Sequence, residues 1–235
     1  TIKRLPAAEY HAMLVRSSSS MLKHMLVSPA HYLAATIPRH VESPAMKFGS
    51  LIHLLVLEPW QLPFEYVVVA EIPKGREARQ LREMYPSHTV LTEVELHEAR
   101  ALAQRIMERK VLGRPFQRFV EEGEPELTFL FDDPVVGLPC RTRVDLWHPD
   151  FIFDLKTTRH ATCSEFQRAA LDLHYDLQAY MYCLAEAVVE KRDTARPFIF
   201  IAAQAAEPHP VHVLSAGDHF LENGRAKYQH AIGLL

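Results

Sequence analysis

The stretch RVDLWHPDFIFDLKTTRH, residues 143–160, places two apolar segments on either side of a Pro-Asp turn. Its Val, Ile, Phe and Trp residues favour β-strands, so the stretch predicts a β-hairpin with residues 148–151 as its loop. In this register three pairs of residues face each other across the hairpin: Trp147 and Ile152, Asp145 and Asp154, and Arg143 and Lys156. Because side chains on a strand alternate between its faces, Asp154 and Lys156 share one face. The hairpin therefore carries a group of charged side chains inside an otherwise apolar segment.

The two facing aspartates predict a metal site. Residues that face each other in a hairpin have Cβ atoms about 5 Å apart, and two carboxylates at that distance repel each other. A Mg²⁺ or Mn²⁺ ion would remove the repulsion, because both ions prefer oxygen ligands. Beside the ion, Lys156 could orient or deprotonate an attacking water or stabilise the charge that develops on a phosphate. The pattern indicates metal-assisted phosphodiester hydrolysis, although an exposed hairpin with its charges in water has the same spacing.

The rest of the chain predicts helices first and strands later. We expect helices at residues 17–35, 45–59, 92–113, 164–191 and 217–235, and strands at residues 65–73, 125–133, 139–147, 151–158, 197–204 and 209–216. Pro29 either ends the first helix or begins a second short one. The cationic residues 74–88 are expected to form a mobile loop with some helix.

This order of elements predicts an α/β fold. Strands joined by short turns pair antiparallel, whereas a strand–helix–strand passage adds a parallel neighbour. We therefore expect one domain over residues 1–235, with a mixed central β-sheet flanked by helices. Its parts would be N-terminal helices at residues 1–60, a core sheet and helix at residues 124–215, and a C-terminal helix at residues 216–235.

The composition argues against several classes of protein. With a net charge of −3 over 235 residues, the chain has no overall cationic field, so contact with a nucleic acid must be local. Three dispersed cysteines suit neither a disulfide framework nor a four-cysteine iron–sulfur cluster. We find no signal-peptide pattern, no apolar run near the about 20 residues that span a membrane, and no phosphate-binding G-x-x-x-x-G-K-[ST] loop. A cytoplasmic protein that is not driven by ATP is expected.

Four motifs, in the same order, resemble the PD-(D/E)xK nuclease superfamily. RVD followed by DLKT resembles the signature of that superfamily. FGSLIHLLVLEP resembles the G-x-x-x-H helix of RecB- and RecE-type nucleases, HYDLQAYMYCLAEA resembles their Q-x-x-x-Y helix, and SSSSMLKHMLVSPAHYLA resembles their N-terminal S-x-L-K…SPAHY segment. Together the motifs cover essentially the whole chain and most resemble the exonuclease VIII (RecE-type) branch of phage and prophage recombination exonucleases. The resemblance implies a restriction-endonuclease-like core.

The resemblance also implies a set of metal ligands. Gly49 and His53 are one helical turn apart, where glycine allows close approach and the imidazole can point inward. Taken alone, a histidine in so apolar a helix is more often a core residue, but beside the motifs we interpret His53 as a ligand of Mg²⁺ or Mn²⁺. The other implied ligands are two carboxylates and one backbone carbonyl, from Asp145, Asp154 and Leu155.

Further residues of the candidate site follow from the same motifs. Gln178 and Tyr182 would hydrogen-bond a DNA phosphate or hold Lys156, unless they pack on the sheet with only their polar tips exposed. Glu126 would border the active site as a counter-charge to Arg143 or Lys156, unless it is a solvated strand end. Residues with hydroxyl or cationic side chains would contact the DNA backbone: Ser18, Ser20, Lys74, Arg76, Arg79, Arg82 and Arg143. A cationic run is also typical of a solvated surface.

The resemblance implies a specific activity. We expect a Mg²⁺-dependent deoxyribonuclease, a 5′ to 3′ exonuclease on double-stranded DNA ends that serves single-strand-annealing recombination in a bacterial or phage-infected cell. A ring-shaped homo-oligomer, a trimer or tetramer, and a RecT-like strand-annealing partner are implied in the same way. Two alternatives stay open: a restriction-like or structure-specific endonuclease with the same site, and a catalytically silent DNA-binding module.

Overall fold

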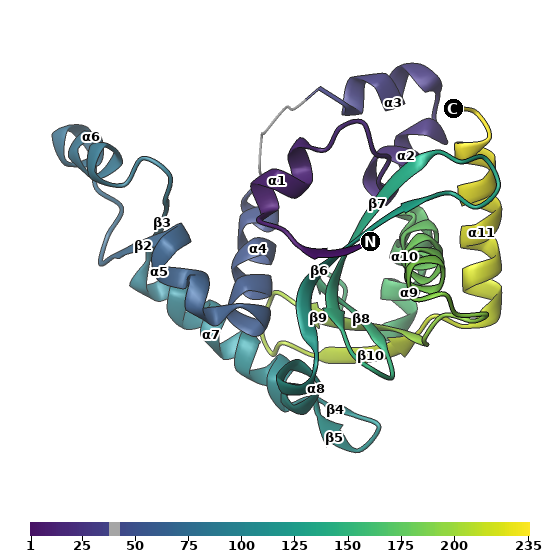
Figure 1. Cartoon of the computed structure of the whole chain (residues 1–235). Coiled ribbons are helices and arrows are strands. Elements are labelled where there is room, and N and C mark those ends of the chain that lie inside the picture. The colour runs from purple at the N-terminus through teal and green to yellow at the C-terminus, as the bar shows by residue number, and fades with distance from the viewer. Residues whose placement is uncertain (38–42) are drawn as a thin grey trace.

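The predicted hairpin lies inside a six-stranded mixed β-sheet (Figure 1). The computed structural model describes residues 1–37 and 43–235. In spatial order the strands are β1 (Ile2–Arg4), β6 (Glu124–Asp132), β7 (Pro139–Trp147), β8 (Ile152–Thr158), β9 (Phe198–Gln204) and β10 (Val211–Ser215). Neighbouring strands are antiparallel except β8 and β9, which pair in parallel. The predicted α/β fold with a mixed sheet is confirmed, and β1 is an edge strand that the sequence pattern did not predict.

Helices cover both faces of this sheet. One face packs against α2 (Ser19–Met25), α9 (Cys163–Asp172), α10 (Tyr175–Glu190) and α11 (Asp218–Ile232). The other face packs against α4 (Pro44–Leu57), α7 (Glu93–Glu108) and α8 (Phe116–Glu122). In β9, Phe198 and Phe200 belong to the first core, whereas Ile199 and Ile201 belong to the second. Burial of both faces explains why β9 is an unbroken apolar run in the sequence.

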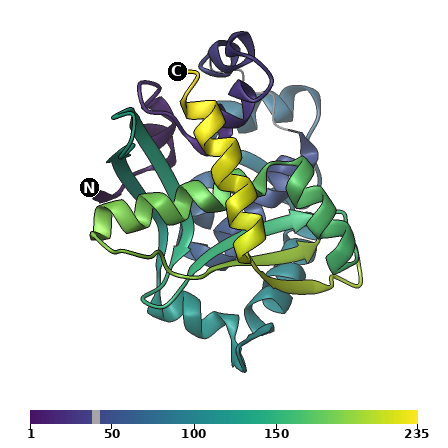
Figure 2. The same ribbon diagram turned by 90° about the vertical axis from the view of Figure 1, so that its right-hand side faces the viewer.

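The crossing of α10 and α11 depends on one glycine. Figure 2 shows α11 passing over α10 on the outside of the sheet. A Cβ atom at Gly224 of α11 would lie 2.0 Å from the backbone carbonyl oxygen of Asp176 in α10. Only glycine allows this approach, which fixes α10, the helix that carries Gln178, against the sheet.

Two of the predicted helices are in fact pairs of helices. Residues 17–35 form α2 and α3 (Pro29–Ala35), and the side chain of Ser28 accepts a hydrogen bond at the start of α3, so Pro29 begins a second helix. The single helix predicted at residues 164–191 was wrong, because His174 has a left-handed backbone (φ +57°) that separates α9 from α10. Among the described residues, no helix combines the length and the apolar character needed to cross a membrane.

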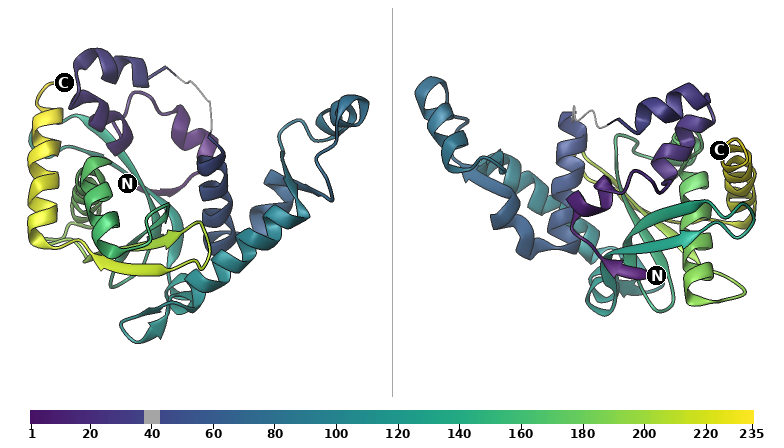
Figure 3. Two further views of the ribbon diagram at one scale, coloured as in Figure 1. Left: turned by 180° about the vertical axis from the view of Figure 1, so that it is seen from behind. Right: turned by 45° about the horizontal axis from the view of Figure 1, so that its top comes forward.

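Residues 59–92 form an arm that projects away from the central sheet (Figures 1 and 3). It consists of a 3₁₀ turn (Pro59–Gln61), α5 (Leu62–Glu65), β2 (Tyr66–Val69), α6 (Gly75–Met84) and β3 (Thr89–Thr92). The predicted strand at residues 65–73 corresponds to β2, which pairs in parallel with β3 in a separate small sheet. The cationic segment expected as a loop is mostly the helix α6. At the other end of α7, beside α8, β4 (Lys110–Val111) and β5 (Arg114–Pro115) form a short hairpin (Figure 1), and α1 (Ala7–Ala12) follows β1.

The register of the β7–β8 hairpin matches the prediction only near its turn. Trp147 pairs with Ile152 as expected, and Leu146 pairs with Phe153, where the ladder ends. The hydrogen-bonded ladder therefore does not reach the other two expected pairs, Asp145 with Asp154 and Arg143 with Lys156. The physical reason is a side chain that replaces a backbone partner: Asp145 Oδ2 accepts the N–H of Leu155 at 2.8 Å.

Candidate active site

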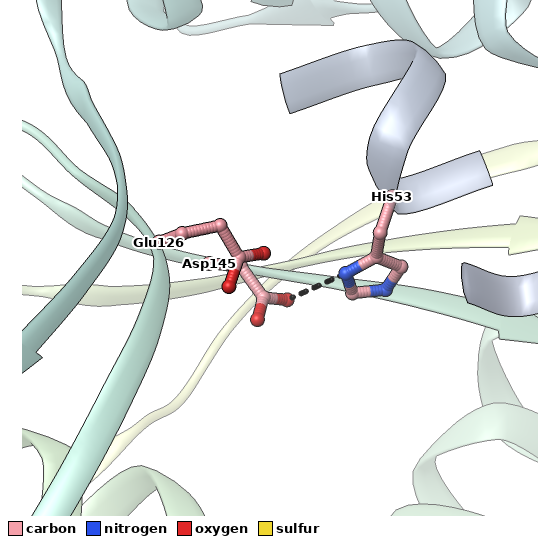
Figure 4. A group of neighbouring side chains, drawn as sticks. All are labelled: His53, Glu126 and Asp145. Atoms are coloured by element: carbon pink, nitrogen blue, oxygen red, sulfur yellow. Dashed lines mark ion pairs between the residues drawn. The ribbon is translucent and has the colours of Figure 1, made fainter. Parts of the chain in front are cut away.

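The G-x-x-x-H segment of α4 lies directly against β8. A Cβ atom at Gly49 would be 2.9 Å from Thr157 Oγ1, so glycine allows the helix to approach the strand. One turn later, His53 Nδ1 lies 3.6 Å from Asp145 Oδ2 (Figure 4). The imidazole also hydrogen-bonds to the backbone of Leu155. Both His53 and Asp145 therefore bind the backbone of the same residue of β8.

Glu126 lies beside Asp145 because of an unusual backbone conformation. It is the third residue of β6, and its φ is +53°. Its neighbours Pro125 and Leu127 pair with Leu146 and Val144 of β7, which leaves Glu126 itself opposite Asp145. A left-handed non-glycine residue costs about 1–3 kcal/mol, and such strain is concentrated at functional sites. The strain here places a second carboxylate beside Asp145.

His53, Glu126 and Asp145 together have the composition of a metal site (Figure 4). Each offers one ligand atom, and the three atoms lie within 4.8 Å of one another. All three side chains are partly buried but still reach solvent. In the part of the chain that the structure describes, this is the one group of three such ligands. Two carboxylates and one imidazole suit a divalent cation such as Mn²⁺ or Mg²⁺.

The electrostatics of the group favour the binding of a cation. Burial and the neighbouring Asp145 raise the pKa of Glu126 to about 7, and burial also raises the pKa of Asp145. Burial and the charge of Lys156 lower the pKa of His53 to about 4, so its imidazole is neutral and has a free lone pair at pH 7. A bound cation would relieve the repulsion between the carboxylates and use that lone pair. The residues present therefore fit a divalent metal ion.

Asp154 and Lys156 form a separate ion pair next to this group. The side chain of Asp154 is fully buried and pairs with Lys156 through Oδ2, while Oδ1 accepts a hydrogen bond from Gln178 Nε2 at 2.9 Å. The amide of Gln178 also donates to the hydroxyl of Tyr182 at 3.1 Å. Burial is the main reason that the pKa of Asp154 is raised, to about 6. For Lys156, Asp154 and Asp145 outweigh the opposing effect of burial and raise its pKa, so it is cationic at pH 7. The Q-x-x-x-Y helix thus holds Asp154, which in turn holds Lys156.

A groove of about 1750 Å³ runs over the site. His53, Glu126 and Asp145 line it, whereas Asp154 and Lys156 lie behind its lining. Other predicted residues that border the groove are Ser20, Arg143, Gln178 and Tyr182. The base of the arm contributes one wall through residues 59–61 and 64–66. The metal-ligand candidates are therefore accessible to a long substrate.

The predicted DNA-contacting residues divide into two sets. Ser18 is buried and hydrogen-bonds to Ser20 at 2.9 Å, so Ser20 alone of the two lines the groove. Arg143 lies at the site, but it is paired with Glu126. The four remaining residues are exposed at or near α6, far along the arm and outside the groove lining: Lys74, Arg76, Arg79 and Arg82.

Lys23 of α2 is the lysine of the S-x-L-K motif, but no role in the site was predicted for it. It lines the groove, although the residues around it in the helix, Met21, Leu22 and Met25, are buried in the core. The available signal was a lone cation in the apolar run MLKHML, inside a motif that the sequence analysis had already singled out.

Comparisons with known proteins identify the family and agree with the fold. A family described as "PDDEXK-like domain of unknown function (DUF3799)" matches residues 18–235. A solved structure of a protein described as a "putative exonuclease" from Eubacterium rectale superposes with a TM-score of 0.63 at 14% identity, over 99% of this chain and 88% of that one. Another, described as SSO0001, covers 98% of this chain and 87% of its own at 13% identity, but its TM-score of 0.33 supports no argument. No curated protein sequence matches the chain.

Proposed function

Because the chain belongs to the family of PDDEXK-like domains of unknown function, we propose that it is a divalent-metal-dependent deoxyribonuclease. The observation that carries this proposal is the meeting of His53, Glu126 and Asp145 at the groove, beside the pair formed by Asp154 and Lys156. The fold shared with the Eubacterium rectale protein, itself described as a putative exonuclease, is consistent with it.

The residues of the site would have two separate roles, metal binding and the positioning of charge. A Mg²⁺ or Mn²⁺ ion, held by Asp145, Glu126 and His53 with Asp154 and the Leu155 carbonyl close by, would supply Lewis-acid activation of water and phosphate. Asp145 also fixes the backbone of Leu155, which sets the position of β8 relative to β7. These contacts hold the acidic side of the site in place before substrate enters.

Lys156 would act as a fixed positive charge. Its pair with Asp154, and the bond from Gln178 to Asp154, restrict where the ammonium group can lie. The ring of Tyr175, with its centroid 4.8 Å from Nζ, supports the same position. A cation held in this way orients water or stabilises charge on a phosphate without having to reorganise during the reaction.

We further propose that the enzyme is a 5′ to 3′ exonuclease on double-stranded DNA ends, acting in recombination by single-strand annealing. The motif order in the sequence supports this choice. A ring-shaped homo-oligomer, a trimer or tetramer, would bring cationic groove residues around DNA while the net charge of the chain stays at −3. A RecT-like annealing protein would be its partner in the cytoplasm of a bacterial or phage-infected cell.

The proposal is tested with linear duplexes labelled at the 5′ or the 3′ end and with covalently closed circles. In Mg²⁺ we expect rapid release of the 5′ label from linear DNA, no cutting of circles, and no activity in excess EDTA. Cutting of closed circles at a rate similar to linear DNA would instead support the endonuclease alternative. Binding without cleavage in Mg²⁺ or Mn²⁺ would support a silent DNA-binding module.

A further inference from the structure

Lys23 is held rigidly at the edge of the groove. It lies in α2, and the neighbouring residues Met21, Leu22 and Met25 anchor this helix in the core. Lys23 itself is half-buried and lines the groove, as do Ser19 and Ser20 of the same helix. Its backbone position is therefore fixed by packing rather than by contacts of its own charge.

The charge of Lys23 lacks a partner within the part of the chain that the structure describes. Neither an ion pair nor a hydrogen bond of its ammonium group is present there, whereas Lys156 pairs with Asp154 and Lys227 pairs with Asp176 at 2.7 Å. Burial, and then the charge of Lys156, lower the pKa of Lys23. A half-buried cation near a second cation is unfavourable in the free protein unless an anion from outside compensates it.

The position of Lys23 indicates which anion that is. The groove that it lines also contains His53, Glu126 and Asp145, so anything that spans the groove passes both the metal-ligand candidates and Lys23. The acidic group would repel an anion in the absence of metal, while Lys23 attracts one. A polyanion with regularly spaced charges can bind at both places, with one phosphate at the metal centre and another at Lys23.

We propose that Lys23 binds a backbone phosphate of the DNA strand that occupies the groove, next to the phosphate that is cleaved. This inference rests on the proposed nuclease function and adds to it a positioning residue for the substrate. Because the contact is to the backbone, it would be independent of base sequence. It would also explain why an unpaired cation is kept in a helix that is otherwise packed into the core.

The test measures DNA binding with a fluorescent linear duplex and increasing KCl, under non-cleaving conditions in which Ca²⁺ takes the place of Mg²⁺ at the oxygen ligands. For Lys23→Met we expect affinity to fall about tenfold. The slope of log affinity against log salt should become shallower by about 0.9, the loss of one phosphate contact. Lys23→Arg should keep the slope of the wild type. Lys110→Met, in the exposed β4–β5 hairpin outside the groove, is the matched control and should change neither quantity.

Two further readouts separate this role from a structural one. In Mg²⁺, Lys23→Met should raise KM by about the same factor as the loss of affinity and change kcat less than about threefold. Its unfolding midpoint in EDTA should equal or exceed that of the wild type, because an unpaired buried charge is removed; if Lys23→Met does not fold, Lys23→Gln replaces it. Wild-type cleavage with an unchanged salt slope and KM in the variant would overturn the role of Lys23 alone. Absence of both binding and cleavage by the wild type would overturn the proposed function as well.

Discussion

Helix α10 contacts two lysine–aspartate pairs of nearly the same chemistry. On its inner side, the buried Asp154 of β8 pairs with Lys156 and accepts a hydrogen bond from the amide of Gln178. On its outer side, the buried Asp176 pairs with Lys227 of α11 and accepts a hydrogen bond from the amide of Asn223. Both aspartates are 0% exposed. In each pair, the aspartate also accepts a hydrogen bond from a side-chain amide of a neighbouring element.

The difference lies in what surrounds each pair. Asp176 accepts a further hydrogen bond from the N–H of Leu177, and the pair closes the contact between two helices. Asp154 instead has a second carboxylate, Asp145, close enough to raise its pKa, and the groove lies beyond. The same ionic chemistry thus serves packing where the charges are balanced, and indicates a binding site where negative charge is left in excess.

The largest expected effect separates the two lysines by activity. Lys156→Met should lower the metal-dependent rate of DNA degradation by at least about 100-fold, because it removes a charge positioned at the reacting phosphate. Lys227→Met, the matched control, should leave the rate per folded molecule within about twofold. Initial rates of nucleotide release, normalised to folded protein, provide the measurement. A similar loss in both variants would show that the inner pair is structural as well.

Stability should not distinguish the two lysines in the same way. Either substitution leaves a fully buried aspartate without its cation, which costs about 3 kcal/mol of unfolding free energy. Urea denaturation of Lys156→Met and Lys227→Met in EDTA measures this cost. If Lys156→Met were as stable as the wild type, the Asp154–Lys156 pair would not be formed in the free protein, and the comparison would fail.

The sequence predicted the parts of this account that depend on neighbours in the chain. Alternation along β8 and the turn after Trp147 were enough to predict the hairpin and to place Asp154 and Lys156 on one face. The order of strands and helices was enough to predict the mixed sheet. Helical spacing was enough to put Gly49 and His53 on one side of α4.

What could not be predicted depends on contacts across the fold. The left-handed backbone of Glu126, which brings it to Asp145, is imposed by the pairing of β6 with β7 on either side of it. The end of the β7–β8 ladder follows from one side chain that takes the N–H of Leu155. Whether Lys23 has an ionic partner depends on residues that are distant from it in the sequence. A local sequence pattern could therefore not predict that it has none among the described residues.

Substitution of Asp145 is expected to have a smaller effect on the unfolding free energy, and of opposite sign. Asp145→Asn keeps an oxygen that can accept the N–H of Leu155 but removes one charge from the acidic group. Because the folded protein raises the pKa of Asp145 above its unfolded value, the ionised carboxylate destabilises the metal-free fold at neutral pH. We expect the variant to gain about 1 kcal/mol of unfolding free energy in EDTA at pH 7.5.

This gain in stability should disappear as the pH falls below the ordinary range of an aspartate, where the carboxyl is protonated in both the folded and the unfolded state. Urea titrations at pH 7.5 and at about pH 3, below the ordinary pKa of an aspartate, provide the check, with the exposed Asp132→Asn as the control. A loss of stability at pH 7.5 would contradict the excess of negative charge.

Binding of Mn²⁺ tests the central claim, that this negative charge is a metal centre, most directly. Calorimetric titration of the wild-type protein should show saturable binding of Mn²⁺ together with a rise in the unfolding midpoint, since the ion binds the folded state. Both signals should be lost in Asp145→Asn and kept in Asp132→Asn. Equal binding by wild type and Asp145→Asn, or none by either, would contradict the assignment of His53, Glu126 and Asp145 as the metal centre.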